Sequence, residues 1–424
     1  MGRKVDVLVI GAGPSGSIVS ALLHQEGIDC MVIDRERFPR FVIGESLLPF
    51  CMHAIQKAGF LGAVLKNQDT LGFQFKNGVA FTRGKNDVDV DYRYFEFSDK
   101  SSEGFGFAFQ VRRSEFDKLL IDEAIKQGVK VQFGVGAKEF CLDKDANGYV
   151  SVLLDSGETI KTKFIVDASG YGRVLARALE LETPSFFLPK MALFTHIEDR
   201  ISEPLYDRKK ILIATHPDFD DVWFWLIPFS DGRCSIGIVG EQDRILNTQQ
   251  SVHTEQERAK VLQEHVYKVP MLKRLLKDAQ WDTPARMISG YSTNVKTLYG
   301  ESYALLGNAG EFLDPVFSSG VTIAMHSSTL LAPLVARIIT GGKVDFEEEY
   351  ARPLNIGINA FKTYVSGWYN QKFQKVIYAS KENHIVKRQV CSILAGFAWD
   401  DANPYVYKSN QALDALYEIC SSEE

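Results

Sequence analysis

Residues that hold metals or form disulfides are few in this chain of 424 residues, and they do not cluster. The six cysteines include no CxxC pair, and the eight histidines include no HxxxH pair. Such spacing favours free thiols over a zinc site or a disulfide framework. Free thiols are typical of a reducing compartment, so we expect a cytoplasmic protein that binds no metal.

Excess positive charge and long apolar runs are also missing. The 48 Lys and Arg residues against 54 Asp and Glu residues give a net charge of −6, which removes the electrostatic basis for binding nucleic acid. No apolar run is long enough to span a membrane, and the one at the N-terminus is too short for a signal peptide. The length predicts a globular protein of two or three domains.

The N-terminal region carries a strand–turn–helix–strand pattern. An apolar run over 5–10 predicts a buried parallel strand, a helical pattern covers 17–25, and a second strand covers 28–33. Asp34 stands at the end of the second strand, where an acidic side chain can accept hydrogen bonds from a ribose. Further βαβ alternation downstream predicts a parallel sheet with an antiparallel insert.

A glycine motif, GxGxxG, lies between the first strand and the helix. Gly11 permits a tight turn, Gly13 lets the backbone approach a pyrophosphate, and Gly16 lets the helix pack closely on the strand. The helix N-terminus then faces the phosphates. An ordinary structural turn is the alternative, and the flanking strands and acid make dinucleotide binding the better interpretation.

The next segments give two local predictions. Residues 73–81 alternate around Asn77 and Gly78, which is the strongest short hairpin signal. Lys76 lies just before this turn, and its position alone favours a solvated lysine. Residues 114–117 fit a capping box, which predicts a helix that begins there and runs to Gln127.

Residues 179–284 are rich in strand patterns. The clearest strand covers 222–228, VWFWLIP, and its alternation places Trp223, Trp225 and Ile227 on one face. An aromatic strand face is commonly part of a core, so the pattern leaves a core role and a site role open. A charged helical pattern follows over 255–277.

The stretch 303–325 reads as a strand, a small-residue turn, a loop and the start of a helix. Ser318 and Ser319 precede the helical pattern, as N-cap residues do, and the helix continues to Thr340 with a bend or break at Pro333. A helix N-terminus suits an anion, a phosphate or an electron-rich ring edge. The alternative is an ordinary strand–loop–helix connection.

The motifs over 4–340 together resemble a flavoprotein family with two dinucleotide-binding domains. This family includes para-hydroxybenzoate hydroxylase-like monooxygenases, geranylgeranyl reductases and flavin-dependent halogenases. The glycine motif and Asp34 match its FAD site, Arg113 matches an arginine near the pyrophosphate and ribityl, and residues 167–170 match its DG-type motif. Residues 307–309 match its GDA motif, although Asn308 replaces the usual aspartate and loses only the charge.

The resemblance implies FAD as cofactor and a set of residues that hold it. These are Gly11, Gly13, Pro14, Ser15, Gly16, Asp34, Arg35, Arg40, Glu45, Ser46, Arg113, Ala168, Ser169, Gly170, Gly307, Asn308, Pro315, Gly320 and Val321.

Three features resemble the halogenase branch. WFWLIP at 223–228 is similar to its WxWxIP signature, FLDPVFSSG at 312–320 to its segment at the flavin ring and halide, and Lys76 to its active-site lysine region. In that chemistry reduced FAD and O₂ oxidise halide, and hypohalous acid travels to a lysine near the substrate. The resemblance therefore implies catalytic roles for Lys76, Trp223, Trp225, Ser319 and Gly320.

Two departures bear on the substrate and partners. Tryptophan halogenases carry a glutamate where this chain has Phe317, and they are longer, so a phenolic, pyrrolic or carrier-bound substrate fits better than tryptophan. Only one GxGxxG is present, which implies a separate flavin reductase or a transient encounter with NAD(P)H. The alternatives are a geranylgeranyl reductase-like dehydrogenase, a hydroxylating monooxygenase, and a flavin-binding sensor or carrier without turnover.

The resemblance also predicts an α/β fold with three parts. A Rossmann-like FAD-binding domain of glutathione-reductase type, with a mixed parallel sheet and helices, is expected to be discontinuous. It is interleaved with an antiparallel β-sheet substrate domain, and C-terminal helices follow. The expected boundaries are 1–74, 106–178 and 284–342 for the first domain, 75–105 and 179–283 for the second, and 343–424 for the helical region.

Overall fold

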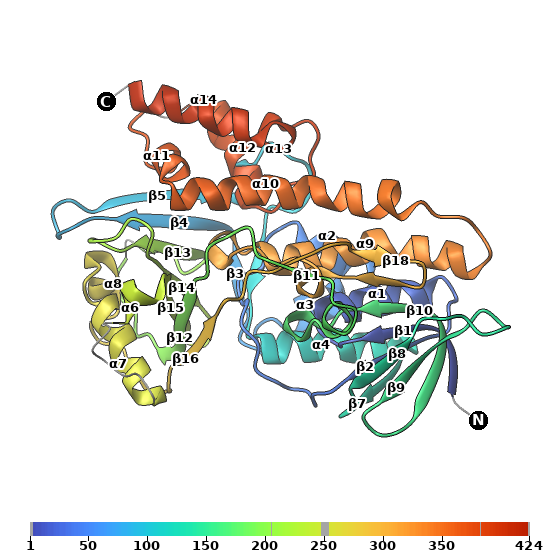
Figure 1. The fold of residues 1–424 in the computed structure, drawn as a ribbon. Helices are drawn as coiled ribbons and strands as arrows, with labels where there is room; N and C mark the ends of the chain where they lie inside the picture. The colour runs from blue at the N-terminus through green and yellow to red at the C-terminus, as the bar shows by residue number, and fades with distance from the viewer. Residues whose placement is uncertain (1–2, 205, 247–253, 382, 423–424) are drawn as a thin grey trace.

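A computed structural model describes residues 3–204, 206–246, 254–381 and 383–422. Figure 1 shows a mixed sheet with its helices beside a second sheet, and a layer of C-terminal helices lying across both. The α/β fold class is confirmed, with parallel and antiparallel sheets together.

The N-terminal strand is an inner strand of the first sheet. Its strands lie in the order β18 (Tyr299–Gly300), β19 (Tyr303–Leu305), β10 (Thr159–Asp167), β1 (Arg3–Ile10), β2 (Cys30–Asp34) and β7 (Lys130–Phe133). All neighbours from β19 to β7 are parallel, while β8 (Ala137–Cys141) and β9 (Val150–Leu154) add an antiparallel insert. The inner strands are apolar because helices such as α1 (Pro14–Gln25), α4 (Arg113–Gln127) and α9 (Ser319–Ile339) cover the sheet.

The second sheet has seven strands. Their order is β16 (Arg286–Ser289), β12 (Met191–Glu198), β15 (Arg233–Gly240), β14 (Trp223–Pro228), β13 (Lys210–Thr215), β4 (Gly78–Arg83) and β5 (Asp91–Glu96). Every pair is antiparallel except β13 with β4. One face packs on α6 (Gln242–Ile245), α7 (Glu255–Val266) and α8 (Pro270–Leu275) through a separate apolar core, which leaves the other face turned toward the first sheet.

Short elements and the C-terminal helices complete the fold. Between the sheets' strands lie α2 (Cys51–Lys57), α3 (Leu61–Asn67), β3 (Gln74–Lys76), β6 (Ala108–Gln110), α5 (Val174–Ala178), β11 (Glu182–Thr183), β17 (Asn294–Val295) and the 3-10 turns η3 (Gly307–Ala309) and η4 (Pro315–Phe317). The last region contains α10 (Arg352–Tyr369), α11 (Lys372–Ile377), α12 (His384–Leu394), α13 (Pro404–Tyr407) and α14 (Ser409–Ser422). The domain boundaries stay a prediction, and β16 joins the second sheet although it lies inside the range expected for the first domain.

The predicted hairpin at Asn77 and Gly78 is wrong. β3 pairs with β6, whereas β4 pairs with β5 and β13, so the two flanking strands do not pair with each other. A Cβ on Gly78 would lie 2.2 Å from the Phe95 carbonyl oxygen, so this glycine serves a close approach between strands rather than a turn. Lys76 is consequently not a solvated turn residue, and its side chain is fully buried.

Helix ends differ from the local patterns in four places. The helix expected to begin with a capping box at residues 114–117 begins instead at Arg113, without a side-chain cap. Ser318 precedes α9 in a left-handed conformation and makes no capping hydrogen bond with its side chain. Residues 255–277 form two helices because Pro270 begins the second, where its missing N–H costs nothing. By contrast, α9 continues through Pro333 as one helix.

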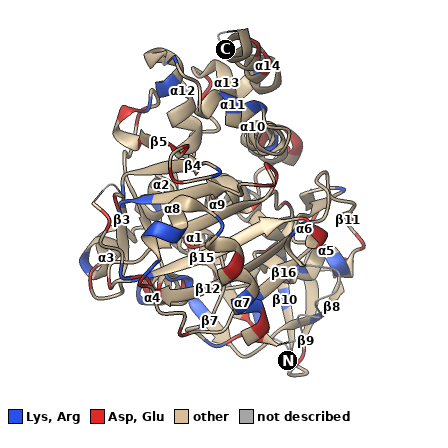
Figure 2. Cartoon of the chain, turned by 90° about the vertical axis from the view of Figure 1, so that its left-hand side faces the viewer, with Lys and Arg blue, Asp and Glu red and all other residues tan. Residues whose placement is uncertain are grey.

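Among the described residues, α9 alone has the length and hydropathy to cross a membrane. More than half of its most apolar window is buried inside the fold, where it packs against α1, α2 and α10. This burial explains its apolar composition as that of a core helix. Figure 2 shows Lys and Arg as well as Asp and Glu scattered over the elements, among residues of other kinds.

Candidate functional site

A cavity of about 640 Å³ lies between the two sheets. Its first wall is formed by residues at the carboxyl ends of β1, β2 and β10, and its second wall by side chains of β12, β13, β14 and β16. Ligands of parallel α/β sheets bind at this edge. The cavity is lined by these expected site residues: Gly11, Gly13, Pro14, Ser15, Asp34, Arg35, Arg40, Glu45, Ser46, Arg113, Ala168, Ser169, Gly170, Trp223, Trp225, Asn308, Pro315, Gly320 and Val321.

The glycine turn closes tightly against the neighbouring strand. Gly11 has φ +103°, and a Cβ there would lie 2.4 Å from the Ala168 carbonyl oxygen. A Cβ on Gly16 would lie 1.9 Å from the Gly11 carbonyl oxygen, so only glycine allows this approach of helix and strand. Gly13 is free of such contacts and faces the cavity, which leaves its backbone open to a ligand.

Two arginines and one carboxylate lie beside this turn. Asp117 is fully buried, receives two hydrogen bonds from the Arg113 guanidinium at 2.7 and 2.8 Å, and receives a third from Arg40 at 3.2 Å. Burial lowers the pKa of Arg113, and Asp117 more than compensates, so the net shift is upward. The arginines exceed the carboxylate by one positive charge, which suits a pyrophosphate.

Within the part of the chain that the structure describes, two buried oxygens of the cavity wall have no hydrogen-bond partner. They are Glu45 Oε2 and Asn308 Oδ1, and both residues line the cavity. Because unpaired buried polar atoms are costly, a ligand with hydroxyl or N–H donors should satisfy them. FAD has such donors on its ribityl chain and flavin ring, so the residues fit this cofactor.

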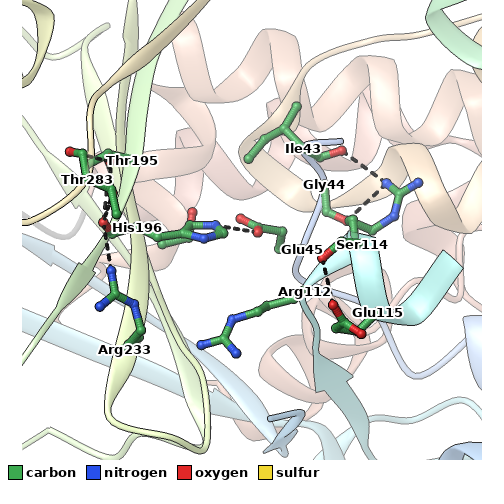
Figure 3. A network of polar contacts seen from close by, with 12 residues as sticks. Ile43, Gly44, Glu45, Arg112, Ser114, Glu115, Thr195, His196, Arg233 and Thr283 are labelled. Atoms are coloured by element: carbon green, nitrogen blue, oxygen red, sulfur yellow. Dashed lines mark hydrogen bonds and ion pairs between the residues drawn. The ribbon is translucent and has the colours of Figure 1, made fainter. Parts of the chain in front are cut away.

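Glu45 also links the two sheets. Figure 3 shows its carboxylate facing the His196 ring of β12, with Glu45 Oε1 at 2.6 Å from His196 Nε2. The His196 carbonyl oxygen accepts hydrogen bonds from the Thr283 hydroxyl and, at 3.5 Å, from Arg233. The family resemblance implied a cofactor role for Glu45, but nothing in the sequence indicated His196, whose position depends on the folded sheet.

The two tryptophans of β14 lie on the second wall. Both are almost fully buried and line the cavity with Ile227, which the alternation placed on the same face. Ile211 and Tyr291 also line it, and the sequence did not single them out. The Trp225 indole donates to Ser235 Oγ at 3.0 Å and covers Gly237, where a Cβ would lie 2.3 Å from the ring. This wall is apolar and aromatic, as suits a flat ring substrate.

Lys76 lies behind the cavity wall rather than on it. Its Nζ donates to Ser46 Oγ at 2.8 Å and to the Leu47 carbonyl oxygen at 2.9 Å, and Ser46 lines the cavity. Burial lowers the pKa of Lys76 to about 7, against an opposing effect from Cys51. The amine therefore exists partly in its neutral, nucleophilic form at neutral pH.

The remaining expected residues lie around the start of α9. Ser319 and Gly320 are its first two residues, and the preceding turn η4 brings Pro315 to the cavity. Gly307, with φ +49°, does not line the cavity and instead packs on Ala324, whose Cβ would lie 2.5 Å from an added Cβ. The first N–H groups of α9 lack intrahelical partners, as at any helix start.

Comparison with known proteins identifies the family. Residues 4–345 match the family model of the FAD binding domain. The chain belongs to this FAD-binding family. It is 26% identical to the 1H-pyrrole-2-carbonyl-(peptidyl-carrier protein) chlorinase of Pseudomonas fluorescens, over 99% of this chain and 94% of that protein. It is 31% identical to tryptophan 2-halogenase of Chondromyces crocatus, over 79% of this chain but only 62% of that protein.

Solved structures agree with this assignment. A flavoprotein/dehydrogenase from Cytophaga hutchinsonii is 38% identical, with a TM-score of 0.89 and complete coverage of both chains. The flavin-dependent brominase Bmp2, at 24% identity and a TM-score of 0.80, shares the fold. The chain is thus a halogenase-like, FAD-dependent oxidoreductase, and FAD is its cofactor. Both were expected from the sequence and are confirmed.

Proposed function

We propose that this protein uses reduced FAD and O₂ to oxidise chloride or bromide and to halogenate a small aromatic ring. The observation that carries the proposal is the buried, partly neutral Lys76 amine directly behind the wall of the FAD cavity. A lysine in this state can take up an electrophilic halogen or hold hypohalous acid by a hydrogen bond. Bound FAD, once reduced, would activate O₂, and O₂ is the oxidant of the halide.

The expected site residues divide into three groups in this proposal. The glycine turn, Arg40 and Arg113 hold the pyrophosphate, and Glu45 and Asn308 receive donors of the cofactor. The start of α9, at Ser319 and Gly320, provides N–H groups for the halide. Trp223 and Trp225 of the aromatic wall orient the substrate ring and keep it apart from the flavin.

A phenolic or pyrrolic substrate, free or held on a carrier protein, is the proposed acceptor. The apolar wall of β14 supports a flat ring, and the relative from Pseudomonas fluorescens acts on a pyrrole held by a peptidyl carrier protein. A separate flavin reductase would supply the electrons. We also propose a cytoplasmic location, since all six cysteines are free thiols, four of them buried.

Halide-dependent product formation tests the proposal. Protein saturated with FAD is reduced by an added flavin reductase, exposed to O₂, and offered phenols and pyrroles with chloride, bromide or neither halide. Mass spectrometry should detect halogenated products only when a halide is present. Hydroxylated products that form equally without halide would contradict the proposal.

A dehydrogenase or reductase is the second candidate. It is favoured by the 38% identical neighbour, which is described as a flavoprotein/dehydrogenase. In that case the reduced flavin should react with an organic acceptor under anaerobic conditions, and O₂ and halide should be dispensable. The same protein sample, tested without O₂, separates the two functions.

A further inference from the structure

One chain of hydrogen bonds joins the three parts of the fold at the cavity. The Trp223 indole N–H, on β14, donates to the Tyr369 hydroxyl at 3.0 Å. Tyr369 is the last residue of α10, and its hydroxyl donates in turn to Asp314 Oδ2 at 2.8 Å. Because an indole can only donate and a hydroxyl carries one hydrogen, both bonds have a fixed direction.

The acceptor at the end of this chain holds the loop that follows it. Asp314 is 1% exposed, and its Oδ1 accepts from the Val316 N–H at 3.0 Å, which fixes the turn η4. Pro315 of that turn lines the cavity, as do Ser318 and Gly320 just after it. The position of Asp314 therefore sets the position of the loop that leads into α9.

The donor at the other end lies on the opposite wall. Trp223 is almost fully buried and lines the cavity next to Trp225, with the two ring centroids 6.0 Å apart. Without the Tyr369 hydroxyl, the indole N–H and the Asp314 carboxylate would each lose a partner in a buried setting. The C-terminal end of α10 thus supplies the hydroxyl that links Trp223 to Asp314.

Figure 1 shows α10 lying across the top of both sheets, so the helix is placed to connect them. Trp368, the preceding residue, packs against Phe81 of β4 and Phe317 of η4, with ring centroids 5.7 and 6.0 Å apart. These apolar contacts anchor the helix on both sides. The hydroxyl of Tyr369 is then held at a fixed place between the walls.

We infer that Tyr369 is a positioning residue, through which the C-terminal helices set the distance between the Trp223 wall and the loop from Asp314 to Gly320. The measurement of halogenated product rests on the proposed function, whereas the link between Trp223, Tyr369 and Asp314 rests on their hydrogen bonds. If the link is lost, the substrate ring and the oxidising site should drift apart, and oxidant should escape before it reaches the substrate.

The link should also depend on pH. Burial raises the pKa of Asp314 to about 6, against the opposing effects of the Val316 N–H, the Tyr369 hydroxyl and the Lys190 ammonium. Tyr291 also faces this carboxyl, with its hydroxyl at 3.5 Å, and the Lys190 ammonium lies 4.2 Å from the centre of the Tyr369 ring. Protonation of Asp314 as the pH falls through 6 removes the charged acceptor of the Tyr369 hydroxyl.

Tyr369→Phe tests the inference, with Tyr364→Phe as its control. Tyr364 lies on the same helix, and its hydroxyl donates to the Tyr405 carbonyl oxygen at 2.7 Å, away from the cavity. Both variants lose one buried hydroxyl, so any general loss of stability should be similar. The FAD-saturated proteins are compared for melting temperature, FAD affinity, and halogenated product formed per O₂ consumed.

In Tyr369→Phe we expect unchanged FAD affinity and a fall in halogenated product per O₂ of about tenfold or more. A hydrogen bond to a charged group contributes about 1.5–3 kcal/mol, and about 1.4 kcal/mol corresponds to a tenfold ratio. Hydrogen peroxide should rise in proportion. Tyr364→Phe should keep the wild-type ratio. Equal ratios in the two variants would overturn the inference.

A second readout separates this inference from the proposed function. If wild-type protein forms no halogenated product, the proposed function fails, and the rate of flavin reoxidation is measured from pH 5 to 8 instead. The inference predicts an inflection near pH 6 in the wild type that is lost in both Asp314→Asn and Tyr369→Phe. An inflection that persists in both variants would overturn it.

Discussion

The buried amine of Lys76 makes a quantitative prediction about stability. Its folded pKa is about 7, against 10.5 for an exposed lysine. Between these values the unfolded chain binds a proton that the folded protein does not, so the free energy of unfolding rises with pH. The penalty for burying the ammonium is complete below pH 7 and disappears as the pH rises toward 10.5.

The expected magnitude follows from these pKa values. Between the folded and unfolded pKa values, each pH unit changes the free energy of unfolding by about 1.4 kcal/mol. From pH 6 to pH 9 the change sums to about 2.7 kcal/mol, because the range below pH 7 lies under the folded pKa and adds little. Lys76→Met keeps the length of the side chain and removes the titration. The wild type should therefore gain this amount relative to Lys76→Met across the range.

Urea unfolding at pH 6, 7, 8 and 9, followed by tryptophan fluorescence with FAD at one saturating concentration, measures the difference. Lys57→Met, made at an exposed lysine of α2, is the control for removing a positive charge. A difference between wild type and Lys76→Met that does not change with pH would contradict a lowered pKa of the Lys76 amine. The Lys76 amine would then keep its proton, and it could not act as a neutral nucleophile.

Three further variants test other parts of the site. Gly13→Leu should abolish FAD binding, measured by flavin absorbance after gel filtration, and retained flavin would show that this turn is not the phosphate site. Gly237→Ala should push the Trp225 ring into the cavity, because the new Cβ would lie 2.3 Å from the ring. FAD binding should persist while substrate turnover falls, and unchanged turnover would mean that the substrate binds elsewhere. Arg113→Met should lower the free energy of unfolding by about 3 kcal/mol, since it removes the main partner of the buried Asp117 carboxylate; a loss below 1 kcal/mol in urea titration would mean that Arg40 suffices.

Local motifs were enough to predict the strand–turn–helix geometry at the N-terminus. The glycine turn and Asp34 are close in sequence, and each requirement is set by steric contacts within one βαβ unit. Asp34 also has a role that the motif did not indicate, since its Oδ2 accepts from the Ala12 N–H at 2.7 Å and thereby holds the turn itself.

Contacts between distant segments could not be predicted in the same way. The Asn77–Gly78 pattern fits a hairpin locally, yet Gly78 is opposite Glu96 and Lys210, which lie far along the chain. Tyr369 reaches Asp314 and Trp223 only because α10 crosses both sheets, and no spacing in the sequence records that crossing. Sequence patterns therefore predicted the glycine turn and its flanking strands, whereas the walls of the cavity depend on contacts between distant segments.

If Lys76 passes the oxidised halogen to the substrate, Lys76→Ala should separate flavin oxidation from halogenation. FAD-saturated wild type and variant are reduced and exposed to O₂ with bromide and an acceptor, and flavin reoxidation and brominated product are followed together. We predict that the variant binds FAD and reoxidises at the wild-type rate but forms no brominated product. Brominated product at the wild-type yield in Lys76→Ala, or its absence from the wild type, would contradict the account.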